Sequence, residues 1–134
     1  MEAANAFGPI DIAISGMRAH GRQLELISGN VANAQTTDAG GGQPYRRVSA
    51  KLSTDDDEFA GVTLERVVTD MTEFPRILDP GNPDADENGY VLMPNVDLPR
   101  ELMNLNTATR NYQANVAILK RYQEMVESTL ELLR

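Results

Sequence analysis

Few side chains in this sequence could carry out catalysis or bind a metal. Its 134 residues include no cysteine and a single histidine, His20. Cysteine nucleophiles, disulfide frameworks, cysteine-based zinc sites and metal sites built from several histidines are therefore excluded. His20 could serve as a base or as a pH-sensitive contact. Because it lies on an apolar row of a predicted helix, we interpret it as a packed or interface residue.

The stretch DADENG at residues 84–89 is the best candidate for a metal site. Asp84, Asp86 and Asn88 occupy the first, third and fifth positions of a calcium-binding loop. However, Asn95 occupies the position where such a loop requires a bidentate glutamate. The sequence therefore favours a hydrogen-bonded acidic turn, with a calcium-dependent sensor as an alternative.

Two other polar stretches are interpreted as loops. The acidic run at residues 55–58 could hold a cation, but such a run is typical of a solvated loop. The three glycines at residues 40–42 lack the lysine and the serine or threonine of a phosphate-binding loop, so they indicate a flexible connector. We therefore expect no enzymatic activity, no cofactor and no small-molecule substrate.

The charge of the chain is negative and unevenly distributed. The 20 acidic and 12 basic residues give a net charge of −8, and residues 45–96 hold eleven of the acidic residues and five of the basic ones. This balance excludes the basic surface of a nucleic-acid-binding protein. No run approaches the ~18 apolar residues that cross a bilayer. Residues 1–9 lack the charged and apolar parts of a signal peptide, so we expect no cleaved signal.

Apolar residues that recur every seven positions predict a long helix at each end of the chain. The first helix is expected at about residues 9–35, with Pro9 in its first turn. It contains three glycines, each of which costs about 1 kcal/mol relative to alanine, so it should need packing to persist. The second helix is expected at residues 98–134, with Asp97 as its N-cap.

The predicted helices differ in length, at ~40 Å and ~55 Å. If they pair as a coiled coil, about a dozen residues of the second helix have no partner within the chain. An apolar row left in water is a partner-binding surface, although both rows could also form the core of an ordinary helical monomer. The predicted assembly interface consists of Ile10, Met17, Leu24, Ile27, Val31, Asn33, Leu105, Tyr112, Val116, Leu119, Val126, Leu130 and Leu133.

The residues between the helices predict a small β-rich unit. Strand-like runs separated by turn signals lie at residues 45–52, 62–68, 76–78 and 90–93. The predicted fold is therefore mainly α, with two long terminal helices packed as a coiled-coil stem and a small β-rich unit inserted between them. We divide the chain into residues 1–39, 40–96 and 97–134.

Several stretches resemble the bacterial flagellar rod and hook proteins. SGNVANAQT at residues 28–36 is similar to the N-terminal signature of this axial protein family. The segment 79–97, DPGNPDADENGYVLMPNVD, is more specific and resembles the rod proteins C, which are subunits of the proximal rod. GQPYRR at residues 42–47 and RNYQANV at residues 110–116 also resemble that family. The resemblance covers essentially the whole chain.

The resemblance implies a structural subunit of the proximal rod of the flagellar basal body. Such a subunit assembles with copies of itself and other rod proteins into a hollow drive shaft that transmits torque. The implied partners also include ring and adaptor proteins at the rod base and, during secretion, the flagellar type III export apparatus. The implied location is the rod in the periplasmic space, after export from the cytoplasm.

One alternative function shares the helical pattern. A cytoplasmic coiled-coil adaptor or chaperone-like binding module would have the same apolar rows, but not the resemblance at residues 79–97. A fully helical monomer or closed dimer, stably folded in solution, would favour this alternative.

Overall fold

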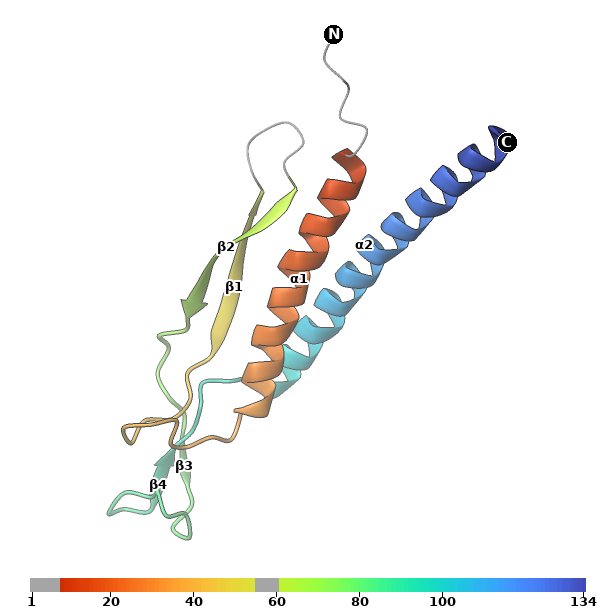
Figure 1. Cartoon of the computed structure of the whole chain (residues 1–134). Coiled ribbons are helices and arrows are strands. Elements are labelled where there is room, and N and C mark those ends of the chain that lie inside the picture. Colours follow the sequence, from red (N-terminus) through yellow and green to blue (C-terminus); the bar gives the residue numbers. More distant parts are fainter. Residues whose placement is uncertain (1–7, 55–60) are drawn as a thin grey trace.

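The computed structural model describes residues 8–54 and 61–134, and it has the predicted mainly α fold with a β unit between the helices (Figure 1). The acidic run at residues 55–58, predicted to be a loop, lies outside the described residues. Within the described ranges, no helix is both long enough and apolar enough to cross a membrane. In chain order the elements are α1 (Gly8–Ala32), β1 (Val48–Thr54), β2 (Val62–Thr69), β3 (Arg76–Leu78), β4 (Tyr90–Leu92) and α2 (Leu98–Leu132).

The two helices have unequal lengths, as predicted, with 25 residues in α1 and 35 in α2. The predicted N-cap of α2 is confirmed, because the Asp97 side chain accepts a hydrogen bond from the backbone N–H of Arg100. α1 ends at Ala32 rather than at residue 35. The side-chain amide of Asn33 donates to the Gly29 carbonyl (2.9 Å), which satisfies a carbonyl in the last turn as the chain turns away.

α1 lies between the β1–β2 pair and α2 (Figure 1). Small residues make this packing possible, since Ala13, Gly16 and Ala19 of α1 and Ala108 of α2 are all buried. A Cβ atom at Gly16 would lie 2.7 Å from the Asn115 side-chain nitrogen, so a larger residue there would displace the Asn115 side chain. Small residues therefore contribute to the contact between the helices, in addition to the larger residues that the sequence suggested.

The β unit consists of two separate antiparallel pairs, β1 with β2 and β3 with β4. The β1–β2 pair runs along α1, where the Ser15 hydroxyl accepts a hydrogen bond from the Val62 N–H (3.0 Å). The β3–β4 pair lies beyond the C-terminal end of α1, at the bottom of Figure 1, and its Val91 is buried. All four predicted strands are therefore confirmed.

Candidate assembly surface and the polar junction beside it

The C-terminal end of α2 is uncovered. α2 diverges from α1 toward its C-terminus (Figure 1), and every residue from Gln123 to Arg134 is exposed. Three residues of the predicted interface lie here: Val126, Leu130 and Leu133 are 40%, 60% and 80% exposed. Among the described residues, no element covers the last dozen residues of α2, which agrees with the predicted difference in helix length.

A second apolar row lies on the same part of α2, and sequence reasoning missed it. Ile118, Met125 and Leu132 are 50%, 57% and 88% exposed. These residues are also spaced by seven, and this periodicity is the sequence signal that identifies the row. With two adjacent rows, the apolar face of this end is wide enough for more than one neighbouring helix.

Nearer the middle of the stem, a hollow opens between the two helices. Its lining includes Met17, Tyr112 and Leu119 of the predicted interface, together with Ile14 and Gly21. These side chains are half-buried. The hollow therefore leaves part of the predicted interface accessible from outside the chain.

The other predicted interface residues occupy different environments. Ile27 is 6% exposed and belongs to the core of the chain itself. Asn33 bonds to the end of α1 and its side-chain oxygen accepts a hydrogen bond from the Thr36 hydroxyl (3.2 Å). The remaining members are half-buried, namely Ile10, Leu24, Val31, Leu105 and Val116.

A buried polar junction lies where α1 ends and α2 begins. Asn30 is fully buried, and its amide nitrogen donates to the Val48 carbonyl (2.7 Å) and to the Glu101 carboxylate (3.0 Å). Its side-chain oxygen accepts from the Val48 N–H (3.0 Å) and the Tyr45 hydroxyl (3.1 Å). All hydrogen-bonding positions of this amide are thus used, and one side chain joins α1, β1 and α2.

Glu101 is the second fully buried member of this junction. Its other carboxylate oxygen accepts a hydrogen bond from the Arg47 guanidinium at 2.7 Å, which pairs the buried charge. Burial raises the pKa of the nearby Tyr45 hydroxyl, and the negative charge of Glu101 raises it further. Tyr45 therefore remains a neutral hydrogen-bond donor to Asn30.

Asn95 extends the junction to the strand connections. Its side-chain oxygen accepts from the Arg47 N–H (2.8 Å), and its nitrogen donates to the Asp70 carbonyl (3.0 Å) and the Thr72 hydroxyl (3.0 Å). Hydrogen bonds from Thr72 also lower the pKa of Asp70 below its ordinary value. Asn95 thus ties the segment before α2 to the end of β2.

The junction brings together three of the stretches that carry the family resemblance. Asn30 belongs to residues 28–36, Arg47 to residues 42–47, and Asn95 to residues 79–97. Sequence reasoning quoted these stretches but did not predict that they meet. Glu101 was missed altogether, because a glutamate in the first turn of a helix ordinarily indicates a favourable interaction with the helix dipole at the surface.

The segment 84–89 forms the predicted acidic turn. One Asp86 oxygen accepts from the N–H groups of Asn88 and Tyr90, both at 2.9 Å, and the other from Arg76 at 2.9 Å. The Tyr90 hydrogen bond is the main reason that the pKa of Asp86 is lowered. Asp84 instead accepts from Thr37 (2.6 Å). Among the described residues, no group of three acidic or histidine side chains is placed to hold a metal ion.

His20 is half-buried on α1, and its Nδ1 lies 3.0 Å from the Gln23 side-chain oxygen. Its partner is therefore one turn away on the same helix. This environment is that of a packed histidine, as interpreted from the sequence.

Comparisons with known proteins agree with this arrangement of motifs. Residues 87–132 match the family described as flagellar basal body rod FlgEFG protein C-terminal. The chain is 37% identical over 127 residues to the flagellar basal-body rod protein FlgC of Agrobacterium fabrum, covering 92% of this chain and 91% of that protein. It is 38% identical over 125 residues to the FlgC protein of Salmonella typhimurium, covering 91% and 93%.

A more distant relative aligns over nearly its full length. The flagellar basal-body rod protein FlgC of Bacillus subtilis is 31% identical over 146 aligned positions, which cover 95% of this chain and 97% of that protein. Identities of this size over almost the whole length of both chains indicate common descent and a shared fold. The chain therefore belongs to the family of flagellar basal-body rod proteins FlgC.

Proposed function

We propose that this chain is a structural subunit of the flagellar basal-body rod that assembles through the uncovered apolar faces of its helices. Membership of the rod protein family supports the rod assignment. The observation that carries the mechanism is the uncovered end of α2, where Val126, Leu130 and Leu133 are exposed. Burying a side chain of this kind contributes ~1.5–3 kcal/mol, so neighbouring subunits that cover this end stabilise the assembly.

The small core of the chain supports the same function. The buried apolar residues of the described ranges are Ala13, Ala19, Ile27, Val91 and Ala108. Three of these five are alanines, which bury little apolar surface. The isolated chain is therefore only marginally stable. Marginal stability suits a subunit that is exported in an unfolded form and completes its packing in the assembly.

The more detailed role is also a proposal. We place the chain in the proximal rod, in the periplasmic space, as part of a hollow drive shaft that transmits torque. Its partners are copies of itself, other rod subunits, ring and adaptor proteins at the rod base, and the type III export apparatus during secretion. A contact between two different surfaces of one subunit builds an open helical array, and the uncovered end of α2 offers one such surface. We propose that this role involves no catalysis, and we retain residues 1–39, 40–96 and 97–134 as its units.

The predicted interface can be tested at its most exposed part. Val126→Asp places a carboxylate on the uncovered end of α2, where no described element of the chain itself packs against it. We expect the variant to be exported but absent from purified basal bodies, and the cells to be non-motile. Leu119→Asp tests the hollow in the same way. Both outcomes are measured by motility assays and by immunoblots of secreted and basal-body fractions.

Ser128→Asp is the matched control for Val126→Asp. Ser128 is exposed on the same end of α2, but two residues later and therefore on nearly the opposite side of the helix. We expect this control to keep motility. Normal motility and normal rods in the Val126→Asp strain would contradict the proposed interface.

A further inference from the structure

The β3–β4 pair presents apolar side chains to solvent. We call residues 76–92, which comprise β3, β4 and the loop between them, the hairpin tip. Leu78, Tyr90 and Leu92 of this tip are 59%, 40% and 42% exposed, and the strand register places them on one face of the pair. Apolar groups clustered on a short pair of strands indicate a surface that another protein covers.

The hairpin tip is also acidic, with four acidic residues and one basic residue. The basic residue, Arg76, pairs with Asp86 at 2.9 Å. The other three carboxylates, Asp79, Asp84 and Glu87, are exposed, and none forms an ion pair with a described residue. Apolar side chains flanked by unpaired carboxylates favour a partner surface that is apolar and basic.

The hollow between α1 and α2 has this complementary chemistry. We call it the stem groove, and its apolar lining comprises Ile14, Met17, Gly21, Tyr112 and Leu119. The charged residues of its lining are Arg18, Arg22 and Glu25. The stretches on either side, residues 12–24 and 102–123, contain five basic residues and no acidic residue. Arg22 pairs with Glu25 at 2.5 Å. The other four basic residues form no ion pair with a described residue: Arg18, Arg110, Lys120 and Arg121.

We propose that the hairpin tip of one copy docks on the stem groove of a second copy of this chain, an inference that rests on the proposed function. Within one copy the two surfaces cannot meet, because the tip lies beyond the C-terminal end of α1 (Figure 1), whereas the groove lies along the middle of that helix. In this contact, the three unpaired carboxylates of the hairpin tip face the four unpaired cations around the stem groove. The apolar side chains of the tip fill the groove. Because two different surfaces meet, the contact repeats along an open helical array.

Disulfide cross-linking tests this contact, because the chain has no cysteine of its own. Leu78→Cys lies in the hairpin tip and Leu119→Cys lies in the stem groove. In basal bodies from cells that produce the full-length double variant, oxidation is expected to yield a ladder at multiples of 14.7 kDa on a non-reducing gel. If Leu119→Cys prevents incorporation, Met17→Cys supplies a second groove position.

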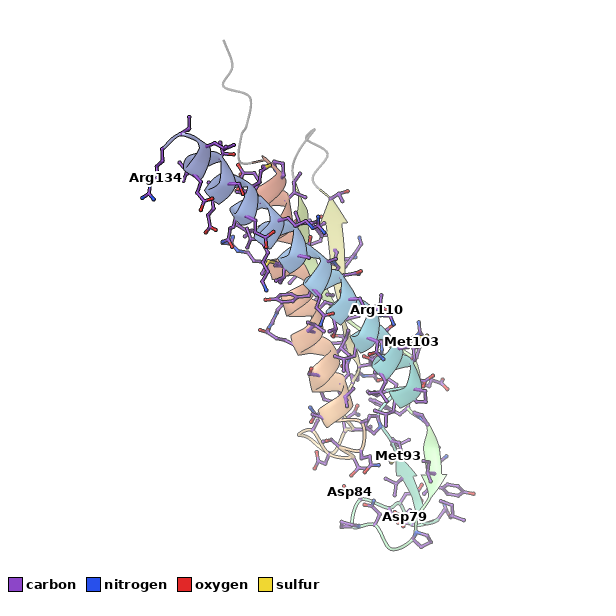
Figure 2. All side chains as sticks on the ribbon, turned by 90° about the vertical axis from the view of Figure 1, so that its right-hand side faces the viewer. Asp79, Asp84, Met93, Met103, Arg110 and Arg134 are labelled. Carbon is purple, nitrogen blue, oxygen red and sulfur yellow. The ribbon has the colours of Figure 1, made fainter. Side chains whose placement is uncertain are left out.

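The matched control combines Leu78→Cys with Met103→Cys. Met103 is 64% exposed on α2 but does not line the groove, and Figure 2 shows it near the N-terminal end of that helix. We expect no ladder from this control. The inference would be overturned by an equally strong ladder in the control or by a cross-link to a different protein. It would also be overturned if basal bodies that contain the groove variant yielded only monomer. Basal bodies that lack even the unmodified chain would instead contradict the proposed function.

Charge reversal provides a second readout of the same contact. Asp79→Lys with Glu87→Lys in the tip is expected to lower the cross-linking yield about tenfold, because like charges then face each other. Adding Arg110→Glu and Lys120→Glu exchanges the charges of both surfaces and is expected to restore the yield. An unchanged yield in the tip variant, or no recovery in the exchanged variant, would contradict an electrostatic contact between copies.

Discussion

At the residue scale, the most constrained group is the pair of Asn30 and Glu101, both fully buried in a chain with a small apolar core. Their hydrogen bond crosses from α1 to α2, and Arg47 neutralises the buried charge from the start of the β unit. A buried polar pair contributes little net stability when compared with apolar residues, but it disfavours every arrangement that leaves one member unpaired. The hydrogen bond between Asn30 and Glu101 therefore favours one register of α2 along α1.

Removing Glu101 tests the importance of the buried pair. Glu101→Ala removes the acceptor of the Arg47 Nε–H and one of the two acceptors of the Asn30 amide nitrogen, and we expect the free energy of unfolding to fall by about 3 kcal/mol. The measurement is urea denaturation of the isolated chain, followed by circular dichroism. Glu127→Ala, on the exposed end of the same helix, is the control and should change stability by less than about 0.5 kcal/mol. Equal midpoints for the two variants would show that the buried pair does not stabilise the fold.

At the element scale, α1 is defined by how closely it approaches α2. Its three interior glycines, Gly16, Gly21 and Gly29, lower its intrinsic helix propensity, but they are not equivalent. At Gly16 an added Cβ would lie within 3.0 Å of three atoms of Asn115, whereas at Gly21 it would meet only Tyr112, at 3.8 Å. A side chain at position 16 must therefore displace the Asn115 amide, whereas a methyl group at position 21 makes only an ordinary contact.

Substitutions at the two glycines should have opposite effects on stability. Gly16→Leu forces α1 away from α2 and is expected to destabilise the chain by about 1–3 kcal/mol. Gly21→Ala removes the glycine penalty without a close contact and should stabilise it by up to about 1 kcal/mol. Thermal unfolding of both variants provides the measurement. A Gly16→Leu chain as stable as the unmodified protein would contradict the close approach of the helices.

At the scale of the whole molecule, the chain is elongated and its charges are segregated along its length. The hairpin tip is acidic, the middle of the stem is basic, and the last residues of α2 are exposed and partly apolar. α1 is held on two sides, by α2 and by the β1–β2 pair, while α1 is the only helix or strand of the described ranges that packs against α2. A molecule built in this way leaves large surfaces for neighbours, which is what a repeating subunit requires.

The isolated chain should therefore be ordered unevenly. We expect rapid hydrogen exchange for the backbone of residues 123–134, since no described element covers them, and slow exchange around Asn30 and Glu101. Circular dichroism of the isolated chain should show less helix than the 25 and 35 residues of α1 and α2, with the difference recovered on assembly. Uniform protection along α2 in a stable monomer or closed dimer would favour the adaptor alternative.

Local sequence patterns were sufficient to predict most secondary-structure elements of this protein. Both helices, the N-cap at Asp97, the four strands, the acidic turn at residues 84–89 and the uncovered end of α2 follow from local patterns. Those patterns are readable because capping, turn formation and apolar periodicity depend on residues within a few positions of one another. The resemblance carried by residues 28–36 and 79–97 likewise needed no structure.

The contacts between residues far apart in the sequence depend on the tertiary structure. Asn30 and Glu101 are separated by 71 positions, and nothing in the local pattern of either residue marks it as buried. Whether large or small residues face the partner helix also depends on the distance and rotation between the helices. Apolar spacing alone therefore did not identify Gly16 and Ala108 as buried residues of the two helices. Helix periodicity specifies an apolar face, whereas burial of that face depends on the complete set of neighbours around it.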